Sequence, residues 1–189
     1  MARKSFGPKP LLYPMPVLII GTYNEDGTAN AMNAAWGMIS DFNEISISLS
    51  EHKTTENLRN RKAFTVSVAT EDQVVACDYV GIASGKTTPN KFEKAGFHVL
   101  RSEFVDAPII EELPLTLECK VKSFEDGILT GEIVNISVDE SILNGDKIDP
   151  KKLKPISFDP SNNNYLSLGE IVGEAFKDGF KIKWVYLKR

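Results

Sequence analysis

Histidine and cysteine are scarce in this sequence, which contains two of each among 189 residues. Cys77 and Cys119 have neither a CxxC spacing nor histidines nearby, which argues against a zinc site or a redox-active pair and predicts two buried thiols. With only His52 and His98 present, a Ser/His/Asp or Cys/His relay has few candidates for its general base. The scarcity therefore argues against most classes of hydrolase.

Long apolar runs and an excess of positive charge are also missing. The longest apolar stretch, residues 16–20, is far shorter than the ~20 residues of a membrane span, and no leader with a small-residue cleavage site precedes it. Lys and Arg number 22 against 26 Asp and Glu, so the net charge of −4 gives no general attraction for a nucleic acid or an anionic bilayer. We expect a cytoplasmic protein that binds neither nucleic acid nor membrane and holds anions only in a local pocket.

The length and composition predict one globular domain over residues 1–189. Hydrophobic residues make up 42% and charged residues 25% of the chain, which is typical of globular proteins and not of disordered ones. A chain of this size can bury roughly 70% of its unfolded surface, so it needs no disulfide or metal for stability.

Strand signals dominate the chain. Residues 43–50 alternate isoleucine and leucine with serine, and the same period of two returns in residues 64–68 and 115–121. Residues 16–23 form a short apolar run, and residues 128–138 are rich in β-formers. Each of these segments is predicted to be a strand.

Turn and helix signals lie between the strands. Asp-Gly pairs at residues 26–27 and 126–127 predict two hairpins. Shorter helices are predicted over residues 54–61, 71–80 and 89–96. Strands interrupted by short helices, without regular βαβ alternation, favour an antiparallel barrel or sandwich with helices over its ends.

The last part of the chain is predicted to be less regular. Residues 147–164 are rich in Pro, Asp and Asn and are interpreted as a long surface connection, either a lid or a partner-facing arm. A final amphipathic piece is expected over residues 168–176.

Three segments carry groups suited to ligand chemistry, and the first is residues 30–37. It mixes small residues with the amides of Asn30 and Asn33 and the indole of Trp36. Small side chains let a flat ligand lie against the backbone, while amide and main-chain N–H groups can meet its polar edge. The alternative is a strand whose alanines pack under a helix, with Trp36 in the core.

The second segment, residues 50–57, lies where a strand ends and a helix begins. Free helix N–H groups, the hydroxyls of Thr54 and Thr55 and the ammonium of Lys53 converge there, which suits a phosphate dianion. The alternative is an ordinary helix cap beside a solvated lysine.

The third segment runs from Asp78 to Phe92. Gly81 and Gly85 permit a loop whose backbone comes close to a ligand, and Lys86 and Lys91 bring positive charge. The spacing is not that of a Walker loop, and the absence of GxGxxG leaves a Rossmann site unsupported. A plain helix terminus is the alternative.

Together these segments resemble the flavin reductase-like family of FMN-binding split barrels, and most closely its flavoredoxin-like branch. The resemblance covers nearly the whole chain, and its pieces follow one another in order: residues 12–14, 21–23, 26–27, 30–36, 52–57, 61–66, 76–85, 91–92, 105–108, 117–119, 131–133, 165 and 169–170.

The resemblance implies a six-stranded antiparallel split β-barrel of Greek-key type with flanking short helices. It also implies a homodimer with FMN near the subunit boundary. In the family, the residues that match Asn30 and Trp36 lie by the isoalloxazine ring, and those that match Lys53, Thr54 and Lys91 hold the phosphate.

Further assignments rest on adjacency to these positions. Ser50, Ala35 and Thr55 are included on that ground, Asn33 stands where relatives commonly have threonine, and Tyr165 is expected to cover the ring. One departure concerns residues 124–127, because flavoredoxin-like relatives often place a histidine in this hairpin and this chain has Phe-Glu-Asp-Gly.

The leading hypothesis is an oxidoreductase in which NADH or NADPH gives hydride to N5 of FMN. Such chemistry needs no catalytic acid or base from the protein, in agreement with the scarcity of histidine. The alternative is a flavoredoxin-type carrier that passes electrons between protein partners. A flavin-binding module without a redox partner, or a structural protein, is the third interpretation.

Overall fold

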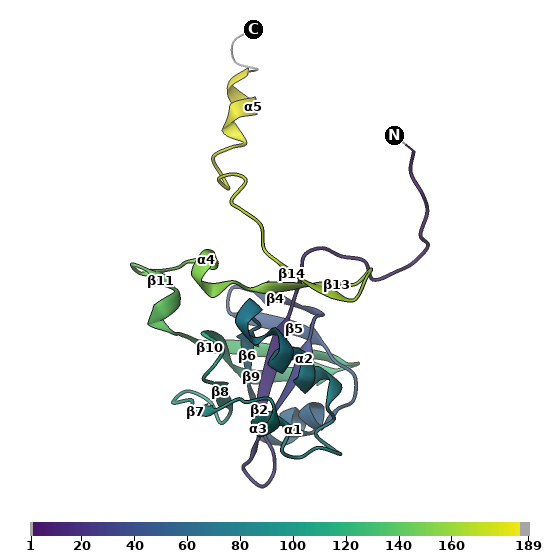
Figure 1. The fold of residues 1–189 in the computed structure, drawn as a ribbon, viewed down its shortest axis with the longest axis vertical. Coiled ribbons are helices and arrows are strands. Elements are labelled where there is room, and N and C mark those ends of the chain that lie inside the picture. The colour runs from purple at the N-terminus through teal and green to yellow at the C-terminus, as the bar shows by residue number, and fades with distance from the viewer. Residues whose placement is uncertain (1, 186–189) are drawn as a thin grey trace.

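Seven strands form one curled antiparallel sheet in the order β3-β2-β6-β9-β10-β5-β4 (Figure 1). The structure is a computed structural model that describes residues 2–185, with the side chains of residues 2–182. The strands are β2 (Leu18–Tyr23), β3 (Ala29–Ala34), β4 (Gly37–Asp41), β5 (Glu44–Ser48), β6 (Ala63–Val68), β9 (Leu115–Glu125) and β10 (Ile128–Val138). The barrel was expected to have six strands, and the seventh arises because residues 37–41 pair with β5.

Smaller pieces surround this sheet. A three-stranded sheet contains β1 (Met15–Pro16), β13 (Ile156–Asp159) and β14 (Asn164–Ser167), and two strand pairs join β7 (Val99–Arg101) to β8 (Pro108–Ile110) and β11 (Leu143–Asn144) to β12 (Lys147–Ile148). The helices are α1 (Lys53–Arg61), α2 (Val74–Ile82), α3 (Lys91–Lys94), α4 (Pro150–Leu153) and α5 (Phe180–Val185), with 3₁₀ turns at Glu71–Gln73 and Glu140–Ile142.

Two hydrophobic clusters lie on opposite faces of β2. Ile19 belongs to the cluster under α2, which includes Val80, whereas Leu18 and Ile20 belong to the cluster that includes Phe64. Successive side chains of a strand point to opposite faces, so a strand buried on both faces must be apolar throughout. This burial explains the unbroken apolar run in residues 16–20.

Several local predictions are confirmed. In β5, Ile45 and Ile47 are buried between less buried serines. Both hairpins form, and Asp126 (φ 50°) and Gly127 (φ 78°) at the tip of the second have the positive φ values that favour an Asp-Gly pair. Cys77 and Cys119 are buried, and desolvation raises the pKa of each thiol to about 12.

The prediction of a long surface connection over residues 147–164 is wrong. The segment contains β12, α4 and β13, and Ile156, Ser157 and Asp159 are buried. Pro150 occupies the first turn of α4, and the side chain of Asp149 accepts a hydrogen bond from the Lys151 amide. The Pro and Asp residues therefore delimit short elements instead of a loop.

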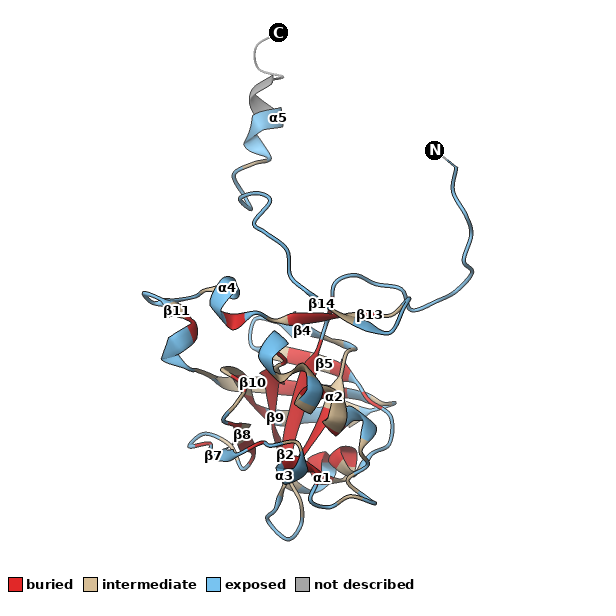
Figure 2. Ribbon diagram, viewed as in Figure 1, coloured by how far each residue is buried: buried red, intermediate tan, exposed pale blue. Residues whose placement is uncertain are grey.

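Both ends of the described chain extend away from the sheet (Figures 1 and 2). The amphipathic piece expected at residues 168–176 is exposed and forms neither helix nor strand, because no face of the body covers its apolar side chains; α5 begins later, at Phe180. Among the helices described, none is long and apolar enough to cross a membrane.

Candidate functional site

The predicted site residues lie along or beside β3, the strand at one edge of the main sheet. An edge strand presents one row of backbone N–H and C=O groups outside the sheet. Asn30 and Asn33 are three residues apart, so they lie about 10 Å apart along the strand and on opposite faces. We call the region around Asn30 and the start of α1 the polar end, and the region from Asn33 to Trp36 the open end.

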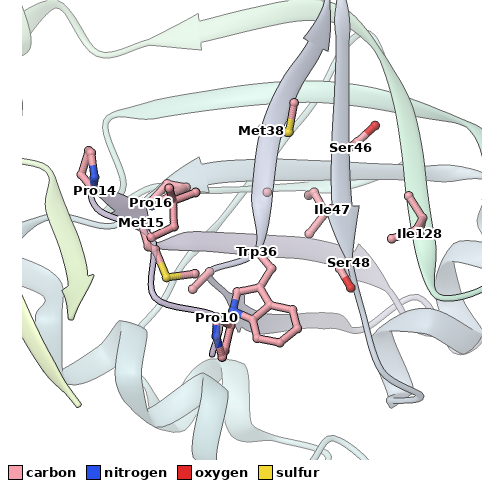
Figure 3. Close-up of a pocket in the computed structure, with 13 residues that line it drawn as sticks. Pro10, Pro14, Met15, Pro16, Trp36, Met38, Ser46, Ile47, Ser48 and Ile128 are labelled. Atoms are coloured by element: carbon pink, nitrogen blue, oxygen red, sulfur yellow. The ribbon is translucent and has the colours of Figure 1, made fainter. Parts of the chain in front are cut away.

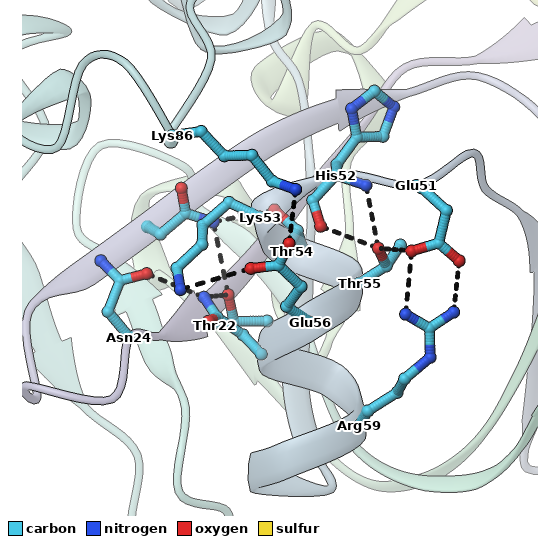
Figure 4. A network of polar contacts seen from close by, with 12 residues as sticks. Thr22, Asn24, Glu51, His52, Lys53, Thr54, Thr55, Glu56, Arg59 and Lys86 are labelled. Carbon is cyan, nitrogen blue, oxygen red and sulfur yellow. Dashed lines mark hydrogen bonds and ion pairs between the residues drawn. The ribbon is translucent and has the colours of Figure 1, made fainter.

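Asn30 ties the polar end together from a buried position. Its side chain is 2% exposed, and its Nδ2 donates to the hydroxyls of Thr54 (2.8 Å) and Thr22 (3.4 Å), two residues that Figure 4 labels. Asn57 also donates to the Thr22 hydroxyl, at 3.0 Å. These bonds fix the first turn of α1 against the edge of the sheet.

The start of α1 is held by its own hydroxyl groups. The Thr55 hydroxyl accepts a hydrogen bond from the His52 amide (2.9 Å) and donates to the His52 carbonyl (2.8 Å). Thr54 and Thr55 are buried, whereas Ser50 is exposed just before the helix. The first amide groups of a helix have no acceptor within it, so this terminus attracts an anion.

The loop after α2 brings a second lysine to the polar end. A Cβ on Gly85 would lie 2.7 Å from Asn30 Oδ1 and 3.2 Å from Lys53 Cβ, so only glycine permits this approach. Lys86 Nζ thereby lies 2.5 Å from Glu56 Oε1, and Lys53 Nζ lies 3.5 Å from Glu56 Oε2. Two ammonium groups and a helix N-terminus converge here.

Lys91 has a different environment from Lys53. It is 4% exposed, and its Nζ donates to the carbonyls of Val80 (3.1 Å) and Ala83 (3.0 Å) at the end of α2. Desolvation lowers the pKa of this lysine to about 8. Lys91 therefore supports the loop that carries Gly85, and both of these bonds are to backbone oxygens of α2 and its cap.

The open end has a cavity of about 280 Å³ instead of a charged cluster. Asn33 Nδ2 donates to the Cys77 carbonyl (3.1 Å) and to the Tyr165 hydroxyl (3.4 Å), which in turn donates to Asp78 Oδ1 (2.7 Å). Desolvation and the Asp78 carboxylate raise the pKa of Tyr165 to about 12. No Lys or Arg is among the described residues that line the cavity: Asn33, Ala34, Ala35, Asp78, Gly81, Ile82, Phe158 and Tyr165.

Trp36 lies on the other side of Ala35, in an apolar groove of about 520 Å³ (Figure 3). The groove is formed by residues of β4 and β5 and by the N-terminal arm, which contributes Pro10, Leu12 and Pro14. Trp36 is 54% exposed, which excludes the interpretation of this indole as part of the core. Its carbonyl accepts a hydrogen bond from the Ser48 amide, so the backbone here is fixed while the indole remains exposed.

Three side chains at the site, those of Lys86, Glu56 and Asp78, are not among the cofactor-binding residues predicted from the sequence. Lys86 carried a signal, because a lysine beside a loop glycine adds charge near a helix terminus. Glu56 has the pattern of an ordinary acidic residue in the first turn of a helix. Asp78 accepts a hydrogen bond from Tyr165, 87 positions away in the sequence, a contact that no local pattern indicates.

Comparison with known proteins shows the family. The model of the flavin reductase like domain matches residues 11–151, so the chain belongs to this family. It is 36% identical to the flavoredoxin of Desulfovibrio vulgaris (Miyazaki F), with a TM-score of 0.90, covering 94% of this chain and 100% of that one.

Two further structures support the same assignment of fold. A flavoredoxin from Methanosarcina acetivorans is 28% identical, with a TM-score of 0.86, covering 96% of this chain and 100% of that one. A protein with a split barrel domain from Shewanella frigidimarina NCIMB 400 is 17% identical, with a TM-score of 0.75, covering 86% of each chain, and shows the fold alone. The predicted split-barrel class is therefore confirmed.

Proposed function

We propose that this protein binds FMN along the outer edge of β3 and works as an oxidoreductase that accepts hydride from NADH or NADPH. The observation that carries the proposal is the chemical contrast along this strand. One end gathers Lys53, Lys86 and a helix N-terminus, and the other end offers a cavity without a cation. A phosphate monoester joined to a neutral ring system has the same contrast.

The residues present fit this cofactor. The amides of α1 and the ammonium of Lys53 suit the phosphate, because charge-assisted hydrogen bonds to a helix terminus are strong. Asn33, Ala35 and Tyr165 border the cavity and suit the ring, together with the exposed indole of Trp36. The buried residues of the polar end, Asn30, Thr54, Thr55 and Lys91, hold the frame, and Ser50 lies at its rim.

The protein's own contribution is to position and shield the ligand. When bound, FMN supplies the redox chemistry itself, as the acceptor of the hydride from the nicotinamide. The chain anchors the charged tail at the polar end, presents backbone groups of β3 to the polar edge of the ring, and keeps the Tyr165 hydroxyl protonated through its bond to Asp78. No acid or base from the protein is needed.

We further propose that residues 1–189 act as one domain in a homodimer. Exposed apolar side chains gather on β4 and next to it, where Trp36, Met38, Ile39 and Phe42 are 54–99% exposed. An apolar patch of this kind marks an interface. Charging it with Phe42→Asp should convert a dimer into a monomer in light-scattering chromatography, and a wild-type monomer would contradict the proposal.

A carrier of electrons between proteins is the second candidate, favoured by the 36% identity to a flavoredoxin. The two candidates differ in whether a nicotinamide reduces the bound flavin directly. Under the carrier proposal, a redox protein must be the electron donor.

The test begins with the visible spectrum of the purified protein, or of the protein loaded with FMN. Anaerobic mixing with NADH and, separately, with NADPH should then bleach the flavin band rapidly if the enzyme proposal is correct. No bleaching with either nucleotide removes the enzyme and leaves the carrier. A preparation that cannot be loaded with FMN contradicts both.

A further inference from the structure

Glu56 lies between the two lysines of the polar end (Figure 4). Its Oε1 contacts Lys86 Nζ at 2.5 Å and its Oε2 contacts Lys53 Nζ at 3.5 Å. The Glu56 carboxylate is thus paired with both of the ammonium groups that a phosphate at the start of α1 would contact. The hydrogen bond from Lys86 and the nearby positive charges lower the pKa of Glu56, so the carboxylate is ionised at neutral pH.

The backbone positions of all three charged residues are fixed by the fold, so the arrangement does not depend on one flexible side chain. Lys53 is fixed to the first position of α1, and Lys86 follows Gly85, whose backbone packs against Asn30 and Lys53 too closely for any side chain. Glu56 is placed one turn into the same helix, three residues after Lys53. The fold therefore sets all three charged groups.

The ion pairs are nevertheless easy to break. The side chains of Lys53, Glu56 and Lys86 are 30%, 40% and 54% exposed, and exposed pairs contribute little free energy. A phosphate monoester carries close to two negative charges at neutral pH, whereas the carboxylate carries one. The phosphate is therefore the stronger competitor for the same ammonium groups.

We propose that Glu56 is an intramolecular competitor for the phosphate of FMN: it holds Lys53 and Lys86 in the ligand-free chain and gives up at least one of them when the phosphate binds. This inference rests on the proposed function. Glu56 then selects ligands by their charge, because a ligand must carry more negative charge than a carboxylate to displace Glu56 from the two ammonium groups. The consequence is that Glu56 weakens FMN binding and leaves riboflavin binding unchanged.

The experiment compares the affinities of the ligand-free, full-length protein for FMN and for riboflavin, measured by quenching of flavin fluorescence. Glu56→Gln should tighten FMN by roughly five- to tenfold, because a like charge next to the phosphate is removed, and should leave riboflavin within twofold. Asp72→Asn is the matched control, since it removes the same charge from another exposed lysine pair, with Lys154, at the opposite end of α2.

A double-mutant cycle checks that Glu56 acts through the lysine. If it does, the gain from Glu56→Gln should shrink in a Lys86→Ala background, because one of the two ion pairs of Glu56 is already absent there and only the pair with Lys53 remains. FMN that binds equally or less tightly to Glu56→Gln overturns the inference while leaving the FMN proposal intact. Failure of both wild type and Glu56→Gln to bind FMN contradicts the proposed function, and the inference with it.

Discussion

The two ends of β3 differ in how completely a single chain builds them. At the polar end, Asn30 and Thr54 are buried and bonded to each other, and the two lysines already have a counter-charge. At the open end, Trp36 is 54% exposed and the neighbouring Met38 of β4 is 66% exposed. Under the proposed function, one chain by itself would hold the phosphate, whereas the ring would need a further surface to cover it.

This contrast has a physical origin in the kinds of interaction involved. The hydrogen-bonding and charged groups at the polar end have partners on β2, β3, α1 and the loop after α2 of the same chain, so the folding of one chain satisfies them. Apolar surface at the open end is favourable only when it is removed from water. A second molecule can cover this apolar surface where the chain's own helices and strands leave it exposed.

The largest effect should come from removing the cation at the polar end. Lys53→Ala should weaken FMN roughly 10- to 100-fold, because a charge-assisted bond is worth about 1.5–3 kcal/mol, and should leave riboflavin nearly unchanged. Fluorescence titration with both ligands checks this. Equal losses for FMN and riboflavin would contradict the assignment of Lys53 to the phosphate.

A smaller loss should follow from crowding the loop that completes the same end. Gly85→Ala places a methyl group 2.7 Å from Asn30 Oδ1, so the loop must shift and carry Lys86 away from Glu56. We expect FMN to weaken about tenfold and the free energy of unfolding to fall by about 1–3 kcal/mol. Gly169→Ala, which meets nothing within 4 Å, is the control and should change neither quantity in urea melts or titrations.

At the open end the pattern of ligand dependence should reverse. Trp36→Ala should weaken FMN and riboflavin alike, by about fivefold, because an aromatic contact contributes roughly 0.5–1.5 kcal/mol to either ring. The free energy of unfolding should hardly change, since the indole is already half exposed. If Trp36→Ala weakened the binding of FMN but not of riboflavin, Trp36 would act on the phosphate and the proposed difference between the two ends would be wrong.

The last prediction concerns pH and the lysine under the loop, and it leaves the contrast between the two ends unchanged. Burial lowers the pKa of Lys91 to about 8, whereas an unfolded lysine has a pKa near 10.4. Between these values the unfolded chain binds more protons, so this group's contribution to stability rises with pH from about 8 to about 10 and is lost as pH falls through 8. Urea melts at pH 8, 9 and 10 should show the rise in wild type and a flatter profile in Lys91→Met; parallel profiles would contradict it.

Much of the architecture was predictable because its signals are local. The isoleucine-serine alternation of residues 43–50 corresponds to β5, and the Asp-Gly pairs form hairpins. The helix expected to be capped by Thr54 or Thr55 is α1, which ends at Arg61 as predicted but begins earlier, with His52 as its N-cap. Residues 147–164 were mispredicted because proline and aspartate mark the ends of short elements as well as loops. The burial of this segment depends on contacts remote in sequence, such as the pairing of β13 with β1 and the packing of Ile156 in the cluster under α2.

The sequence alone predicted strands β2, β5, β6, β9 and β10, helices α1 to α3, the family and the candidate residues around Asn30, Lys53 and Trp36. These depend on side-chain periodicity, turn chemistry and order along the chain. Tertiary structure decided how the charges are shared. It buried Lys91 against the carbonyls of α2, brought Lys86 to Glu56 through the close approach at Gly85, and joined Tyr165 to Asp78. Such contacts depend on distances between elements remote in sequence, which no local pattern encodes.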